Sequence, residues 1–219
     1  MRRKSAVRRT ERGADDQLRI VLAQEAARLI CDHGLTDYLA AKHKAAEKLG
    51  LANVRALPNN REIDAAVAEH TRIFRGDLQA SGLQEMRATA MRIMQLLEMF
   101  QPRLTGAVLS GNITGHSVIE LHLISEPAEE IDRCLTNARI SYSSAPRRLK
   151  LQRDRSEEFP AYRFRIDSFE VLATVLPERR RMHAPLSPVD GRPMRRARLK
   201  ELQQLLAAAS EADDISLPL

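Results

Sequence analysis

Apolar residues in the first hundred positions recur every three or four residues, as on the buried side of an amphipathic helix. The repeats are interrupted at Gly34, where a helix can end, and by a polar stretch at 76–82 that predicts a loop. Thr36 and the Asn59-Asn60 pair can cap the helices that follow them. Four helices are therefore expected, at residues 15–33, 36–49, 60–74 and 83–100.

The period changes from helical to alternating in the second half of the chain. Within residues 117–124, Ile119, Leu121 and Leu123 share one face of a strand, while Val118, Glu120 and His122 share the other. We expect the first set to be buried against helices and the second set to lie on the opposite face. Further strands are expected at 104–109, 148–152, 161–166 and 170–176, and helices at 127–137 and 194–209.

This order of elements predicts an α+β protein, in which an N-terminal helical region precedes a small mixed or antiparallel sheet flanked by helices. The expected organisation is a disordered basic tail at 1–14, a helical region at 15–100, an α+β domain at 101–209 and an acidic tail at 210–219.

Charge and composition narrow the classes of function. The formal net charge is +6 over 219 residues, but much of the excess lies in the opening MRRKSAVRRTER, so it describes a tail more than a binding surface. Aromatic residues make up 4% of the chain, so platforms for stacking bases are scarce. No run is long enough to span a membrane, and no apolar stretch of an export signal follows the basic start. With only Cys31 and Cys134, we expect a reducing cytoplasm. The oligomeric state is left open.

Several signatures of catalysis are missing from the sequence: there is no GxxxxGK[ST] phosphate loop, no GxGxxG, no GxSxG and no Cys/His metal spacing. The stretch RLTGAVLSGNITGHSVIELHLI, however, resembles the nucleotidyltransferase superfamily, with its DNA polymerase beta-like fold. The pattern of that superfamily is an apolar strand, a glycine turn that opens a helix, and a strand with two carboxylates at i and i+2. The chain is also similar to a group of bacterial nucleotidyltransferase-like proteins of about this length. The similarity lies in the order of three segments, AARLICDHGLTDYLAAKHKAAEKLGL, LPNNREIDAAV and PVDGRPMRRARLKEL.

The resemblance implies a phosphate site at the turn Ser110-Gly111-Asn112, where backbone N–H groups at the start of a helix would hold a nucleotide. Positive charge near this site would come from arginines in PVDGRPMRRARLKEL, namely Arg192, Arg195, Arg196 and Arg198. Other interpretations are open: Gly111 can be an ordinary turn glycine, and RRARLK the solvated face of the last helix.

The resemblance also implies catalytic carboxylates at Glu120 and Glu170, and a metal site at Glu120 and His122 that would hold magnesium if the protein is active. Val118 stands where the first carboxylate belongs, and a two-metal site needs several carboxylates. We therefore expect a degenerate site that binds nucleotide or RNA ends. The alternatives are an active magnesium-dependent nucleotidyltransferase, or a strand whose Glu120 and His122 simply face solvent.

A second class of function is a DNA-binding regulator. LRIVLAQEAARLICDHGLTDYLAAKHKAAEKLGL resembles the opening of a helix-turn-helix repressor, with two helices around a glycine turn. Its recognition helix would depend on Lys42, Lys44 and Lys48. The alternating strand at 117–124 is not typical of the helical remainder that such a repressor would have.

Overall fold

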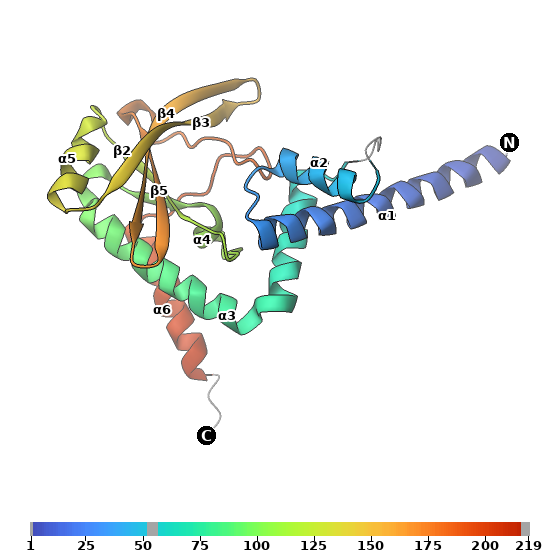
Figure 1. The fold of residues 1–219 in the computed structure, drawn as a ribbon, viewed down its shortest axis with the longest axis horizontal. Helices are drawn as coiled ribbons and strands as arrows, with labels where there is room; N and C mark the ends of the chain where they lie inside the picture. The colour runs from blue at the N-terminus through green and yellow to red at the C-terminus, as the bar shows by residue number, and fades with distance from the viewer. Residues whose placement is uncertain (1, 52–56, 216–219) are drawn as a thin grey trace. The chain divides into compact units, whose positions relative to one another are not determined.

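The computed structural model describes the backbone of residues 2–51 and 57–215, and side chains within 15–51, 57–73 and 80–209 (Figure 1). It is an α+β protein with a five-stranded mixed sheet, as the sequence predicts. The helices are α1 (Arg2–His33), α2 (Tyr38–Lys48), α3 (Asn60–Leu96), α4 (Gly106–Ser110), α5 (Glu129–Asn137) and α6 (Leu199–Ile215), with short 3-10 turns at Glu98–Phe100 and Glu178–Arg180. The strands are β1 (Arg103–Thr105), β2 (Ile119–Ile124), β3 (Tyr142–Gln152), β4 (Arg155–Ile166) and β5 (Phe169–Leu176).

The chain forms two compact units whose boundary lies inside a helix. The first unit runs up to Gly76 and includes Thr114–His116, and the second contains the rest of the chain from Asp77 onward. The loop predicted at 76–82 is wrong, because α3 continues through it. Two glycines in that stretch each cost about 1 kcal/mol in a helix, which the apolar stripes on both sides can offset.

Cap residues fix the helix starts of the first unit. Asp37, one residue after the predicted Thr36, accepts a hydrogen bond from the Leu39 N–H at 2.7 Å. Asn59 and Glu62 form a reciprocal capping box, with N–H to side-chain oxygen distances of 3.0 and 2.7 Å. Of the two cap residues predicted from the sequence, Asn59 or Asn60, the structure has Asn59. The helices of this unit bury a small core, which includes Leu22, Ala26, Ala45, Ile63 and Val67.

The ends of the described chain are helical. Helix α1 begins at Arg2, so it takes in most of the stretch that the sequence predicts as a disordered basic tail. Helix α6 runs to Ile215 and includes the start of the predicted acidic tail, while residues 216–219 lie outside the described residues. Within the described ranges, no helix combines the length and the apolar character needed to cross a membrane.

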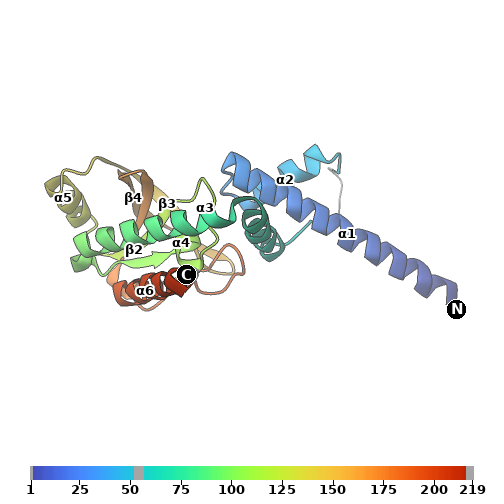
Figure 2. The ribbon, with the colours of Figure 1, turned by 90° about the horizontal axis from the view of Figure 1, so that it is seen from below.

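The sheet of the second unit has the strand order β1-β2-β5-β4-β3. Strands β2 and β5 are parallel, and the other neighbouring pairs are antiparallel. Ile119, Leu121 and Leu123 of β2 are completely buried in one core with residues of α3, α5 and α6. These helices border the sheet in Figures 1 and 2. The predicted register of β2 is therefore confirmed.

The long connection 177–198 between β5 and α6 crosses the sheet. Its Leu186 N–H donates to the Lys150 carbonyl of β3 at 2.7 Å, and its Ala197 pairs with Leu104 of β1 at the opposite edge. The connection therefore contacts both edges of the sheet. The second face of the sheet, opposite that of Leu121, is also partly enclosed, because its His122 and Thr174 are completely buried.

Candidate functional site

The second face of the sheet gathers polar side chains on neighbouring strands. Arg103 of β1 stands opposite His122 of β2, and His122 stands opposite Thr174 of β5. Glu120 lies on the same face as His122, because the two residues are two positions apart on β2 and side chains alternate along a strand. We call this surface, centred on Glu120, His122 and Thr174, the polar face.

Glu120 is already paired with a cation. Arg147 of β3 donates from Nη2 to Glu120 Oε2 at 2.6 Å, and its Nη1 lies 3.4 Å from Thr174 Oγ1. The Glu120 side chain is 20% exposed and that of Arg147 28% exposed. Because the pair is partly buried and hydrogen-bonded, Arg147 neutralises the carboxylate that the sequence assigns to metal and catalysis.

Gly106 allows the Glu120 carboxylate to lie against the backbone. Its φ is +73°, and a Cβ atom at this position would lie 2.5 Å from Glu120 Oε1. Any side chain here would meet both the left-handed backbone and the carboxylate. Gly106 also ends β1 and opens α4, so the segment 104–109 expected as a strand is a three-residue strand followed by a short helix.

His122 is completely buried on the polar face, so the interpretation in which it faces solvent is wrong. Burial, together with the charges of Arg147 and Arg196, lowers its pKa to about 3. The imidazole is therefore neutral at physiological pH. Among the described residues, neither of its ring nitrogens has a hydrogen-bond partner, which is unusual for a buried polar group.

The residues of the polar face do not fit a magnesium site. Glu170 lies on β5, but its carboxylate is paired with Arg163 of β4. The structure brings Glu120 and Glu170 to one face and gives each of them an arginine. In the described part of the chain, no group of three or more His, Cys, Asp or Glu residues could hold a metal ion. A divalent cation at Glu120 would also meet the charges of the neighbouring arginines.

The turn Ser110-Gly111-Asn112 closes a helix rather than opening one, which corrects the geometry expected from the resemblance. Gly111, at φ +91°, is the C-terminal cap of α4, and its N–H donates to the Ala107 carbonyl at 2.8 Å. The Asn112 N–H lies 3.4 Å from Ser110 Oγ. A helix end presents carbonyl groups, which repel a phosphate.

Buried Arg87 of α3 binds this end of α4 from the core side. Its guanidinium donates to the Val108 and Leu109 carbonyls at 3.2 and 3.4 Å. The arginine therefore satisfies carbonyl groups that the end of a helix leaves without partners. Nucleotide binding by Ser110, Gly111 and Asn112 remains a prediction that this geometry does not favour.

The two other predicted phosphate ligands lie apart from the polar face. Arg192 is exposed in a turn, where its N–H donates to Asp190 Oδ1 at 3.0 Å. The Arg195 carbonyl accepts from Thr105 Oγ1 at 3.0 Å. Burial lowers the pKa of Arg87, and the charge of Arg195 lowers it further.

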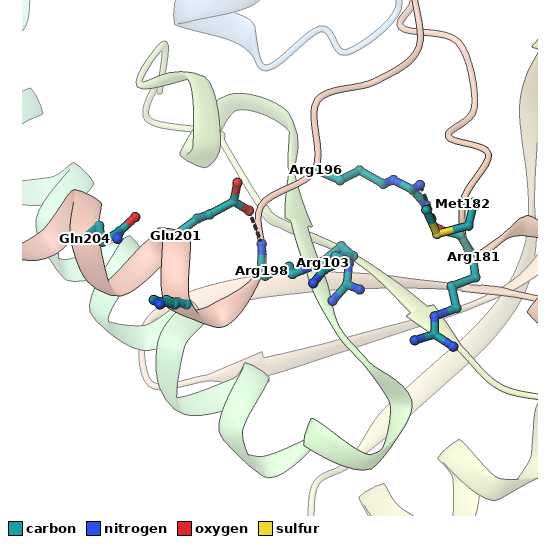
Figure 3. A pocket seen from close by; sticks show the side chains of 8 residues that line it. Arg103, Arg181, Met182, Arg196, Arg198, Glu201 and Gln204 are labelled. Carbon is teal, nitrogen blue, oxygen red and sulfur yellow. Dashed lines mark hydrogen bonds between the residues drawn. The ribbon is translucent and has the colours of Figure 1, made fainter.

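A cluster of cations borders the polar face at the β1 edge. Four arginines from three segments surround an open hollow of about 590 Å³ (Figure 3). The sequence pointed to Arg196 and Arg198, but it missed Arg103 and Arg181. We call this feature the arginine hollow; it is lined by Arg103, Arg181, Met182, Arg196, Arg198, Lys200, Glu201 and Gln204.

Positive charges lie close together in the arginine hollow. Burial lowers the pKa of Arg103, and the charges of Arg198 and Arg196 lower it further. Among the described residues, Arg103, Arg196 and Arg198 form no ion pair. Arg196 Nη2 donates to the Arg181 carbonyl at 3.0 Å, and Glu201 accepts from the Arg198 backbone N–H at 2.7 Å. Arg181 is paired with Glu178, and Glu201 acts on Arg103, so the positive charge of the cluster is only partly offset.

The lysines expected for DNA recognition are partly engaged inside the first unit. Lys48 Nζ lies 2.9 Å from Glu25 Oε1. Hydrogen bonds from Arg28 and, to a lesser extent, from Lys48 lower the pKa of the Glu25 carboxyl to about 2, although burial acts in the opposite direction. Lys42 is half-buried, and burial lowers its pKa. No observation on this surface favours the regulator over the nucleotide-binding alternative.

Comparison with known proteins adds no constraint on function. No family model matches the chain, and neither a curated protein nor a solved structure matches it. The polar face and the arginine hollow are therefore the features from which we infer a function.

Proposed function

We propose that this protein is a nucleotidyltransferase-like cytoplasmic protein that binds nucleotides or RNA ends, with arginines in the place of metal ions. The observation that carries the proposal is the pairing of Glu120 with Arg147, next to an arginine hollow in which Arg103, Arg196 and Arg198 form no ion pair among the described residues. A carboxylate site neutralises a phosphate through metals, whereas this surface offers the positive charge directly.

Catalysis is expected to be weak or absent. Nucleotidyl transfer by the metal route needs several carboxylates, and Val118 precedes β2 where the resemblance implies the first of them. We expect little transfer from radiolabelled nucleoside triphosphates in the presence of magnesium. Val118→Asp would restore a ligand of the right kind at the right spacing, and robust turnover by the natural chain would contradict the degenerate site.

The test of binding is calorimetric titration of ATP and of a 5′-phosphorylated RNA oligonucleotide, with magnesium and with EDTA. We expect affinity to survive EDTA, because arginines and not metals neutralise the phosphate. Glu120→Gln should leave affinity unchanged or raise it, since it removes a negative charge. Loss of binding in EDTA and in Glu120→Gln would show instead that the carboxylate holds a metal.

A further inference from the structure

We infer that the arginine hollow is a site for terminal phosphate groups that recognises the phosphate and not the base. The ligand class is a phosphate monoester or polyphosphate end, as on a nucleotide or on the end of an RNA strand. This inference rests on the proposed function and names the position and the specificity of the contact.

The backbone holds the cations of the hollow in place. Leu104 of β1 and Ala197 exchange two backbone hydrogen bonds, at 2.9 and 2.8 Å. Ala197 and Leu104 both belong to the apolar core. Because side chains alternate along an extended chain, Arg196 and Arg198 point to the same side as Arg103. In Figure 3, Arg103 comes from β1, whereas Arg196 and Arg198 come from the connection that precedes α6.

The hydrogen-bond donors of the arginine hollow are suited to an anionic ligand. Arg196 Nη1 is buried and, like the imidazole of His122 on the same side of the sheet, has no hydrogen-bond partner among the described residues. The positive charges of Arg198 and Arg196 act unfavourably on Arg103, and a ligand with negative charge would relieve this. A terminal phosphate carries up to two charges and an internal phosphodiester one, so the terminal group gains more from several guanidinium groups. Guanidinium forks also match the geometry of phosphate oxygens.

The lining offers little that could read a base. It contains no aromatic ring, and its apolar member, Met182, is 76% exposed. Base recognition depends on stacking and on hydrogen bonds to the base edge, and stacking usually comes from aromatic side chains. The one carboxylate, Glu201, is occupied by the Arg198 N–H at the start of α6. The hollow should therefore bind the phosphate end of any nucleotide about equally.

The experiment is a set of titrations in EDTA with four probes: inorganic tripolyphosphate, ATP, CTP and adenosine. We expect similar affinities for the first three, within about threefold, and no binding of adenosine, because the phosphate supplies the contacts. The double variant with Arg103→Gln and Arg198→Gln should bind tripolyphosphate about tenfold or more weakly. Arg198→Gln alone, at an exposed position, should show a smaller loss in the same direction even if the double variant folds poorly.

The matched control is Arg148→Gln, an exposed arginine of β3 away from the hollow. It removes the same charge and should leave affinity unchanged. Equal losses in this control would show that only net charge matters, and the inference would be wrong. Circular dichroism of all variants checks that the fold is kept.

Oligonucleotides separate this inference from the proposed function. A 5′-phosphorylated RNA should bind better than the same RNA with a 5′-hydroxyl. If both RNAs bind equally, or if ATP binds and tripolyphosphate does not compete, the inference fails while nucleotide or RNA binding stands. If no probe binds, both fail.

Discussion

The two faces of the sheet in the second unit come from the same strands and differ in the polar and charged side chains that they hold. On one face, Ile119, Leu121 and Leu123 are completely buried against helices. On the other, Glu120 and His122 stand among arginines whose charges are only partly offset. One face packs apolar side chains against helices, while the other combines a small apolar cluster, including Ile124, Phe159 and Leu176, with polar groups that are costly to bury.

His122 shows how far this difference goes. It is as deeply buried as Leu121, yet its ring nitrogens have no partner among the described residues. Buried polar groups without partners are uncommon in folded proteins, and they gather at functional sites more often than in the core. The comparison of the two faces teaches that burial alone does not distinguish the apolar face of Leu121 from the polar face.

The largest expected effect is on the apolar face. Leu121→Ala should lower the free energy of unfolding by about 3 kcal/mol, because it leaves a cavity in a fully buried site. Urea unfolding followed by circular dichroism measures the loss. Arg163→Gln, on an exposed position of β4, is the control and should change stability by less than about 0.5 kcal/mol. Equal effects of the two changes would break the comparison.

Gly106 tests the contact between the backbone and the polar face. Gly106→Ala should cost about 2 kcal/mol, because it combines left-handed strain with a clash against Glu120. Gly191→Ala is a matched control, since Gly191 has φ +68° with nothing within 4 Å of the added Cβ. It should cost about 1 kcal/mol for the backbone alone. A cost no larger at 106 than at 191 would show that Glu120 does not depend on the glycine.

The pH dependence of stability tests the burial of His122. Its pKa is about 3 in the folded state against an ordinary 6.5, so below pH 6.5 the unfolded chain binds a proton that the folded chain does not. Above pH 6.5 His122 is neutral in both states and costs no stability. Between pH 6.5 and pH 3 the free energy of unfolding should fall by about 1.4 kcal/mol per pH unit. His122→Leu should flatten this slope. The control His183→Gln, at an exposed position, should not change the slope. An unchanged slope in His122→Leu would contradict the neutral buried imidazole.

The smallest effect is expected in the arginine hollow. Without ligand, Arg103→Gln should raise stability by about 0.5–1 kcal/mol, because it relieves repulsion from Arg196 and Arg198. The gain should shrink as salt is added, since exposed charges are screened. Thermal unfolding at two salt concentrations measures it. A loss of stability that does not respond to salt would show that Arg103 stabilises the fold.

The sequence predicted the register of β2 because alternation is a local property, and a slip of one residue would bury Glu120 in place of Leu121. It misread 104–109, since a short apolar run fits a strand as well as a helix and only the positive φ of Gly106 separates the two. The same ambiguity led to Gly111 as the glycine that opens a helix, whereas Gly106 opens α4 and Gly111 closes it.

The arginine hollow could be predicted only in part. Arg196 and Arg198 stand out as a basic run, but their approach to Arg103 depends on the pairing of Ala197 with Leu104, nearly a hundred positions earlier in the chain. Arg147 reaches Glu120 from β3, which is separated from β2 in the sheet by β5 and β4. The alternation placed His122 on the correct face, but its complete burial depends on tertiary packing around the strand.

A crystal structure of the protein soaked with ATP and Mn²⁺ tests the central claim most directly, because anomalous scattering locates the metal independently of the nucleotide. We expect the terminal phosphates beside Arg103, Arg196 and Arg198, the ion pair between Glu120 and Arg147 intact, and no manganese at Glu120. Manganese bound by Glu120 and Glu170, with the phosphates on the metal and the arginine hollow empty, would contradict the account.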